Sequence, residues 1–149
     1  MTINSRPVEI LLVEDDLGDS DLIQEVFEES QFSVTINLVR DGDSAIAYLR
    51  QEGEYANATL PDLILLDLNL PPLGGQEVLK AIKSDNYLKH IPVIILTTSD
   101  SREDILRSYQ LGANSYISKP LGLEEFVEVI RLIEDYWFNI VKLPNQRNQ

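Results

Sequence analysis

The sequence contains no cysteine, and this absence excludes several kinds of site at once. A chain without thiols has no disulfide framework, no cysteine-ligated zinc centre and no thiol nucleophile. It is compatible with a reducing compartment, and its 149 residues are enough for one domain with one hydrophobic core. We therefore expect a single domain that folds without a covalent or metal staple.

Basic residues and long apolar runs are also scarce. The chain has 12 lysine and arginine residues against 25 aspartate and glutamate residues, a formal net charge of -13. It has no concentrated basic patch, so we expect no direct binding to nucleic acid or to anionic membranes. No apolar run approaches the roughly 20 residues of a membrane span, and residues 1–7 are polar. The prediction is a soluble, cytoplasmic protein.

The sequence does contain a regular alternation of strand-like and helix-like segments. Continuous apolar runs are typical of strands buried on both faces of a parallel sheet. Such runs occur at Val8–Val13, Leu63–Leu66, Val93–Leu96 and Tyr116–Ile117. The segment Ser33–Val39 instead alternates polar and apolar residues, which predicts a half-exposed edge strand.

Between these runs the apolar residues recur at helical spacing. Amphipathic stripes lie around Val26, Val78 and Leu106, and the last helix is predicted over residues 123–136. Residues suited to capping helix N-termini occur at Asp19–Asp21, Asp43–Ser44 and Asp100–Ser101. Five strand–helix alternations predict an α/β fold, an open doubly wound sheet with helices on both faces.

Polar or charged residues follow each central run at the point where the strand should end. The residues are Glu14, Asp15 and Asp16 after the first run, then Asp67, Thr97 and Lys119 after the later ones. In an open α/β sheet, ligands bind at the carboxyl ends of the strands. We therefore expect these side chains to meet at one edge of the sheet.

Their chemistry predicts phosphoryl transfer. Asp67 directly follows an apolar tetrad, and an ionised carboxylate beside a core needs a counter-charge. The neighbouring acids would repel it unless a hard cation bound among their oxygens, and Mg²⁺ prefers such ligands. A carboxylate can attack phosphorus to form an acyl phosphate, while Mg²⁺ and the Lys119 ammonium neutralise the phosphoryl oxygens and Thr97 bonds one of them. The residues thus predict an Mg²⁺-dependent phospho-acceptor site centred on Asp67.

With these motifs in this order, residues 8–136 resemble the receiver domains of response regulators, the CheY-like proteins of two-component signalling. The resemblance implies a five-stranded parallel sheet of order 2-1-3-4-5. It implies that Glu14 and Asp15 bind Mg²⁺ or Mn²⁺ together with Asp67 and the backbone carbonyl of Asn69. It also implies that Asp67 is the residue that a sensor histidine kinase phosphorylates.

The same resemblance assigns roles to further residues near the ends of the fourth and fifth predicted strands. It implies that Thr97 and Tyr116 rearrange on phosphorylation and bias the face formed by the fourth helix, fifth strand and fifth helix. It implies a cis peptide bond between Lys119 and Pro120. Few residues remain after Tyr136, so we expect a stand-alone receiver whose output is a protein contact.

A narrower similarity concerns the end of the chain. The segments Glu134–Phe138, Val141–Pro144, Asp16–Asp21 and Gln51–Pro61 are similar to response regulators that partner cyanobacterial phytochromes. This similarity implies a phytochrome as the kinase partner. The expected organisation is an extension over residues 1–7, a receiver domain over 8–138 and a tail over 139–149.

The last helix is apolar around more of its circumference than one contact with a sheet requires. One stripe comprises Phe126, Val127, Ile130, Ile133 and Trp137, and a second comprises Val129, Leu132, Tyr136 and Ile140. Either the tail Asn139–Leu143 folds back over the helix, or the helix forms a symmetric homodimer. The candidate dimer residues are Val129, Leu132, Tyr136, Trp137 and Phe138.

Two rival functions stay open at this point. An aspartate-nucleophile phosphohydrolase uses the same residue types, but it carries a second Asp two residues after the nucleophile, where this chain has Asn69. A receiver-like binding module that is never phosphorylated commonly has an eroded site, whereas this site is complete. His90, the only histidine, is predicted as a surface residue and not as a phospho-donor, and Asp41–Asp43 as a turn.

Overall fold

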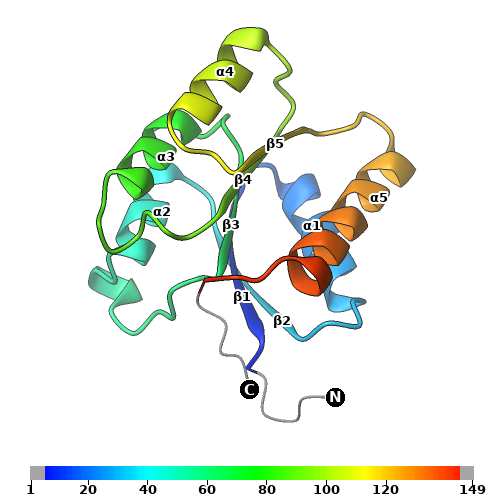
Figure 1. Cartoon of the computed structure of the whole chain (residues 1–149), viewed down its shortest axis with the longest axis horizontal. Coiled ribbons are helices and arrows are strands. Elements are labelled where there is room, and N and C mark those ends of the chain that lie inside the picture. The colour runs from blue at the N-terminus through cyan, green and yellow to red at the C-terminus, as the bar shows by residue number, and fades with distance from the viewer. Residues whose placement is uncertain (1–5, 145–149) are drawn as a thin grey trace.

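The computed structural model describes residues 6–144, which contain one five-stranded sheet (Figure 1). Its strands are β1 (Val8–Val13), β2 (Val34–Val39), β3 (Leu63–Leu66), β4 (Val93–Thr97) and β5 (Ser115–Ser118). All neighbouring strands are parallel, and the order is β2-β1-β3-β4-β5. Both the doubly wound α/β fold and the predicted strand order are confirmed.

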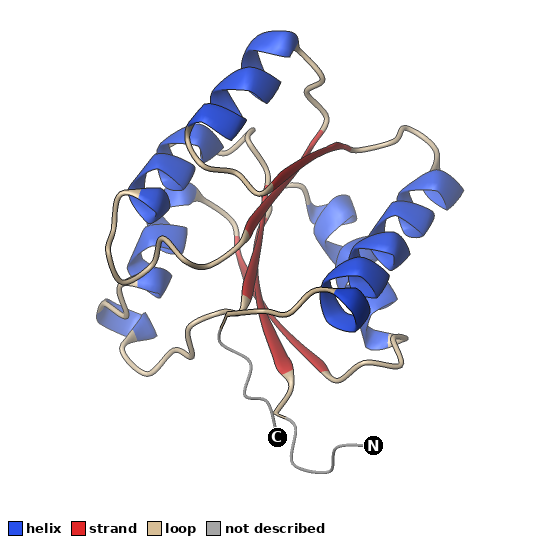
Figure 2. Ribbon diagram, viewed as in Figure 1, coloured by secondary structure: helices blue, strands red, loops and turns tan. Residues whose placement is uncertain are grey.

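Helices cover both faces of the sheet (Figure 2). On one face lie α1 (Leu17–Glu28) and α5 (Leu123–Glu134); on the other lie α2 (Gly42–Leu49), α3 (Gly75–Lys83) and α4 (Arg102–Gln110). A short 3-10 helix, η1 (Gly53–Tyr55), follows α2, and a π-helical turn, η2 (Asp135–Ile140), continues α5. None of the helices within residues 6–144 is long and apolar enough to cross a bilayer.

Each face of the sheet buries its own hydrophobic core. Successive residues of a strand point to opposite faces, so Leu11 and Ile64 contact the core under α2 and α3, whereas Ile10 and Leu63 contact the core under α1 and α5. All four side chains are fully buried. At the edge, most of β2 is only partly buried, as its alternating sequence predicts.

The N-terminal caps differ from the prediction in two helices. The Asp16 carboxylate accepts from the Asp19 backbone N–H at 2.8 Å, and that of Asp41 accepts from Ser44 at 2.7 Å. The capping residue is the last one with extended backbone before the helix. Asp19 and Asp43 therefore lie inside the first turns of their helices and Asp21 lies further along α1. Residues 42–43 begin α2 instead of forming a turn. The predicted Ser101 cap of α4 is confirmed.

Both ends of the described chain pack onto the domain. The guanidinium of Arg6, which we assigned to an extension, donates to the buried Asp62 carboxylate at 2.6 and 2.8 Å. Near the other end, Leu143 is 4% exposed and lies in the same core as Val8. The remaining parts of the predicted extension and tail, residues 1–5 and 145–149, lie outside the described residues.

The tail buries Leu143 in the core, but it leaves the second stripe of the last helix open. Leu132, Tyr136 and Ile140 remain 56%, 52% and 65% exposed. Val129 and Trp137 are partly buried beside them. The Phe138 ring turns inward instead, against the rings of Phe27 and Phe32 with centroids at 6.0 and 5.6 Å. Phe138 therefore does not belong to the exposed apolar surface of the last helix, and dimerisation through the other candidate residues stays a prediction.

Candidate phospho-acceptor site

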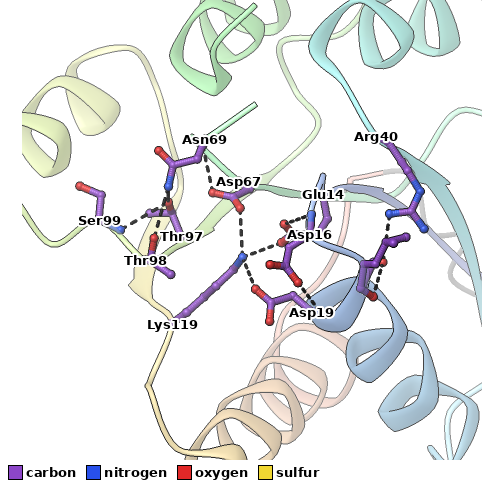
Figure 3. Close-up of polar contacts among 12 residues, drawn as sticks. Glu14, Asp16, Asp19, Arg40, Asp67, Asn69, Thr97, Thr98, Ser99 and Lys119 are labelled. Carbon is purple, nitrogen blue, oxygen red and sulfur yellow. Dashed lines mark hydrogen bonds and ion pairs between the residues drawn. The ribbon is translucent and has the colours of Figure 1, made fainter. Parts of the chain in front are cut away.

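Four of the predicted site residues meet at the carboxyl ends of the strands (Figure 3). Glu14 follows β1, Asp67 follows β3, Thr97 ends β4 and Lys119 follows β5. Their exposed fractions are 1%, 6%, 0% and 7%, so this polar group is withdrawn from solvent. The site lies beside β1 and β3, where the strand order reverses, which is where doubly wound sheets bind ligands.

The Lys119 ammonium lies at the centre of the group. Its Nζ atom is 2.8 Å from Glu14 Oε1, 2.8 Å from Asp19 Oδ2 and 3.0 Å from Asp67 Oδ2. An ammonium has three N–H donors, and each is directed to a different carboxylate. Asp19 is the member that the sequence did not reveal, because an acid in the first turn of a helix already satisfies the helix dipole.

Three carboxylates around one ammonium leave an excess of negative charge. Burial, followed by the proximity of Asp67, raises the pKa of Glu14 to about 7 despite the opposing effect of Lys119. Burial also acts to raise the pKa of Asp67. Three interactions outweigh this effect of burial and lower the pKa of Asp67. They are the hydrogen bond from the Asn69 backbone N–H to Asp67 Oδ1 at 3.1 Å, the hydrogen bond with Glu14, and the charge and hydrogen bond of Lys119. Of the Glu14 and Asp67 pair, Asp67 is therefore the carboxylate that favours its ionised form.

The surrounding carboxylates keep Lys119 protonated. Burial alone would lower its pKa, but the hydrogen bonds to Asp19 and Glu14 and the charge of Asp67 raise it above the ordinary value. A protonated ammonium beside an ionised carboxylate can stabilise the negative charge of a phosphoryl group that approaches the carboxylate.

The residues present fit a hard divalent cation. The buried donors are carboxylate oxygens with surplus negative charge, which is the ligand chemistry of Mg²⁺. Asp15, another of the predicted ligands, is exposed after the end of β1. Within residues 6–144, no group of three or more acidic or histidine side chains is arranged so that it could hold a metal ion as it stands.

On the other side of Asp67, amide and hydroxyl groups form a loose polar cluster. Asn69 Nδ2 donates to Thr98 Oγ1 at 3.3 Å and to Thr97 Oγ1 at 3.5 Å. Thr97 is buried and Thr98 exposed. The Asn69 side-chain amide is thus shared between the hydroxyls of Thr97 and Thr98. The long distances leave the Thr97 hydroxyl free to take another partner.

Tyr116 connects β5 with the loop that follows β4. Its hydroxyl donates to the Ser99 carbonyl at 2.9 Å, and its backbone N–H donates to the Tyr109 hydroxyl of α4 at 3.1 Å. The side chain is partly buried. A change of rotamer at Tyr116 would therefore break a bond to the β4–α4 loop, two residues from Thr97.

A glycine behind the acceptor is a second residue that sequence reasoning missed. The Gly75 N–H donates to the Leu68 carbonyl at 3.0 Å, and a Cβ at Gly75 would overlap the carbonyl oxygen of Asp67. The sequence signal was the glycine pair at 74–75, of which only the second is in close contact.

The peptide bond between Lys119 and Pro120 is a correction to the prediction. No peptide bond within residues 6–144 is cis, so this bond is trans in the structure. Trans is the intrinsically preferred isomer of an X–Pro bond, by about 0.5–1 kcal/mol.

The fold and the site together define a class of protein: a doubly wound sheet whose switch point holds a buried carboxylate against a lysine. The family model that describes the response regulator receiver domain matches residues 10–131. The chain belongs to the response-regulator receiver family.

Known members of the family are similar along nearly the whole chain. Response regulator Rcp1 of Synechocystis sp. is 46% identical over 141 residues, which cover 95% of this chain and 96% of Rcp1. The crystal structure of the phosphorylated cyanobacterial phytochrome response regulator RcpA has a TM-score of 0.92 at 50% identity, covering 94% of this chain and 100% of RcpA. The Mn²⁺-bound form of Rcp1 has a TM-score of 0.90 at 46% identity, covering 93% and 99%.

Proposed function

We propose that Asp67 accepts a phosphoryl group from a phosphohistidine of a sensor histidine kinase. The observation that carries this proposal is the buried Asp67 carboxylate, whose Oδ2 lies 3.0 Å from the Lys119 ammonium. A carboxylate with a lowered pKa is ionised at neutral pH and needs no base before it attacks phosphorus.

The transfer step balances with the groups that this chain supplies. An oxygen of Asp67 forms a bond to phosphorus, the P–N bond of the phosphohistidine breaks, and the imidazole nitrogen keeps the electron pair. Lys119 redirects its donor from Asp67 Oδ2 to a phosphoryl oxygen, and the Thr97 hydroxyl donates to another. Both groups stabilise negative charge that a carboxylate site alone would repel.

A divalent cation completes the proposal. Glu14, Asp15 and Asp67 would hold it with the backbone carbonyl of Asn69, and Mg²⁺ or Mn²⁺ would supply positive charge to the phosphoryl oxygens. The surplus of carboxylates over ammonium groups supports this assignment, as does the Mn²⁺-bound form of the similar protein Rcp1.

The output of the switch is proposed to be the face of α4, β5 and α5. On phosphorylation, Thr97 would turn toward the phosphoryl group, and the Tyr116 hydroxyl would break its hydrogen bond to the Ser99 carbonyl. This face would therefore have two conformations, and phosphorylation would shift the balance between them. The cognate kinase is proposed to be a phytochrome, because RcpA is described as a phytochrome response regulator and shares 50% of its residues with this chain.

The proposed output partner includes a second copy of this chain. Val129, Leu132, Tyr136 and Trp137 line an apolar groove of about 330 Å³ against Ile117 of β5. An exposed apolar groove with aromatic residues at its rim is the composition of a protein interface. A symmetric dimer would pair each groove with the same surface of its partner.

Membership of the receiver family disfavours the phosphohydrolase alternative. Such enzymes need a carboxylic acid two residues after the nucleophile, and here the Asn69 amide donates to threonine hydroxyls instead. Steady turnover of small phosphate esters would revive that alternative. The unphosphorylated module is disfavoured by the complete buried set of Glu14, Asp67 and Lys119.

The proposed function is tested by intact-mass measurement after incubation with acetyl phosphate and Mg²⁺. The wild type should gain the mass of one phosphoryl group, and Asp67→Asn should gain none. No gain in the wild type, or the same gain in both proteins, would contradict the assignment of Asp67.

A further inference from the structure

The Lys119 ammonium has one partner whose role the proposed function leaves unexplained. Of its three carboxylates, Asp67 is the phospho-acceptor and Glu14 is a proposed metal ligand. Asp19 is neither, yet its Oδ2 lies 2.8 Å from Nζ, as close as Glu14 Oε1 and closer than Asp67 Oδ2 (Figure 3).

Asp19 is held in a fixed place by its own helix. It lies in the first turn of α1, where its backbone N–H donates to the capping carboxylate of Asp16 at 2.8 Å. The same helix contacts both β2 and α5. The Asp19 carboxylate therefore lies on a helix that is packed against the rest of the domain.

This contact is unlike an ordinary surface ion pair. Exposed pairs contribute little because water screens the charges and both side chains move freely. Here the Lys119 side chain is 3% exposed and that of Asp19 28% exposed, so the pair is largely shielded. All three ammonium donors are already used, which leaves the lysine little freedom to reorient.

We propose that Asp19 is a positioning residue that keeps the Lys119 ammonium directed at the acceptor while its other two partners change. This inference rests on the proposed function. During transfer, Lys119 exchanges its bond to Asp67 for one to the phosphoryl group, and cation binding withdraws charge from Glu14. The bond to Asp19 is the one that persists through the cycle, so its loss lets the ammonium drift from the transferring group.

The test measures the rate of phosphorylation by acetyl phosphate across a titration of MgCl₂. At saturating Mg²⁺, Asp19→Ala should be slower than the wild type by about tenfold, the order of effect of one hydrogen bond between charged groups. Asp19→Asn keeps an oxygen acceptor and should fall between them. Asp21→Ala removes an exposed acid two residues away and should change the rate by less than about twofold.

Two further readouts separate positioning from a general structural or electrostatic effect. The Mg²⁺ concentration for half-maximal rate should stay within about twofold of the wild type in Asp19→Ala, because Asp19 is not a proposed ligand. In a Lys119→Ala background, the Asp19→Ala substitution should have no additional effect, since residues that act through one another are not additive. Circular dichroism verifies that each variant is folded.

The outcomes distinguish this inference from the function on which it rests. If the wild type gains no phosphoryl group on Asp67, both fall. If it does, and Asp19→Ala reacts as fast as Asp21→Ala, the positioning role alone is wrong. The positioning role is also wrong if Asp19→Ala slows phosphorylation further in the Lys119→Ala background. It is wrong as well if Asp19→Ala changes only the Mg²⁺ concentration for half-maximal rate.

Discussion

One lysine balances three carboxylates in this site, and that imbalance determines how individual residues should respond to substitution and to cations. Glu14 and Asp67 are almost fully buried, so their charge is screened by protein groups and bound ions more than by water. The chemistry of the site is therefore a property of a few named side chains.

At the residue scale, we predict that Mg²⁺ stabilises the fold through Asp15. At a Mg²⁺ concentration tenfold above the dissociation constant, binding adds about 1.4 kcal/mol to the free energy of unfolding, or roughly 3–5 °C in Tm. Calorimetric melting with and without MgCl₂ measures this shift. Asp15→Asn should lose most of it, whereas Asp16→Asn, which keeps a good N-cap, should retain it. An undiminished shift in Asp15→Asn would exclude Asp15 as a ligand.

Gly75 gives a second prediction at this scale. A Cβ at Gly75 would overlap the Asp67 carbonyl oxygen, whereas one at Gly74 would lie 3.9 Å from its nearest neighbour, the Leu68 carbonyl oxygen. Gly75→Ala should lower the free energy of unfolding by about 1–3 kcal/mol. Gly74→Ala should cost less than about 1 kcal/mol. Urea denaturation compares the two variants, and equal losses would show that the close approach is not limiting.

Sequence alone located the central site residues because each breaks a local rule. Asp67 directly follows the apolar strand Leu63–Leu66, and Lys119 lies two residues after the short apolar run Tyr116–Ile117, so each charge near the core needs a partner. Asp19 breaks no rule, since an acid near a helix N-terminus is favourable in any case. Its contact with Lys119 spans 100 positions in the chain, and only the folded packing of α1 against the end of β5 reveals it.

At the scale of helices and strands, the presence and type of each element were easier to predict than the residues at which it begins and ends. β1 and β3 were predicted with their observed ends, because charged residues limit their apolar runs: Glu14 follows β1, and Asp62 and Asp67 flank β3. The starts of α1 and α2 were placed too late. Several acids in succession can each act as a cap, and backbone conformation decides among them.

The end of α5 carries a prediction about pH. Glu134 is 6% exposed, and burial raises its pKa above the ordinary 4.5 despite its hydrogen bond with Ser30 and the charge of Arg131. The folded state therefore binds this proton more tightly than the unfolded state. Its contribution to stability falls as pH rises from about 4.5 through the raised value, and the ionised form is the destabilising one.

Glu134→Gln should accordingly raise the free energy of unfolding at pH 8, and the gain should shrink as the pH is lowered to 5. Urea denaturation at the two pH values measures the difference. Glu128→Gln, an exposed position on the same helix, serves as the control and should show no comparable dependence. A gain for Glu134→Gln that is the same at both pH values would contradict the role of burial.

At the scale of the whole molecule, the open groove beside α5 predicts self-association. Leu132→Asp places a charge in the centre of this apolar surface and should shift the sedimentation coefficient from that of a dimer to that of a monomer. Leu17→Asp, on an exposed leucine of α1, should leave the sedimentation coefficient unchanged. A wild type that sediments as a monomer at all concentrations, with and without acetyl phosphate, would contradict the dimer.

The central claim is that the phosphoryl group resides on Asp67, and chemical trapping tests it most directly. Borohydride reduces an aspartyl phosphate to homoserine, which marks the modified residue by a change of mass in a proteolytic peptide. After reaction with acetyl phosphate and Mg²⁺, homoserine should appear at position 67 and at no other aspartate. Homoserine at Asp15 or Asp16, or its absence from position 67 in a protein that has gained a phosphoryl group, would contradict the account.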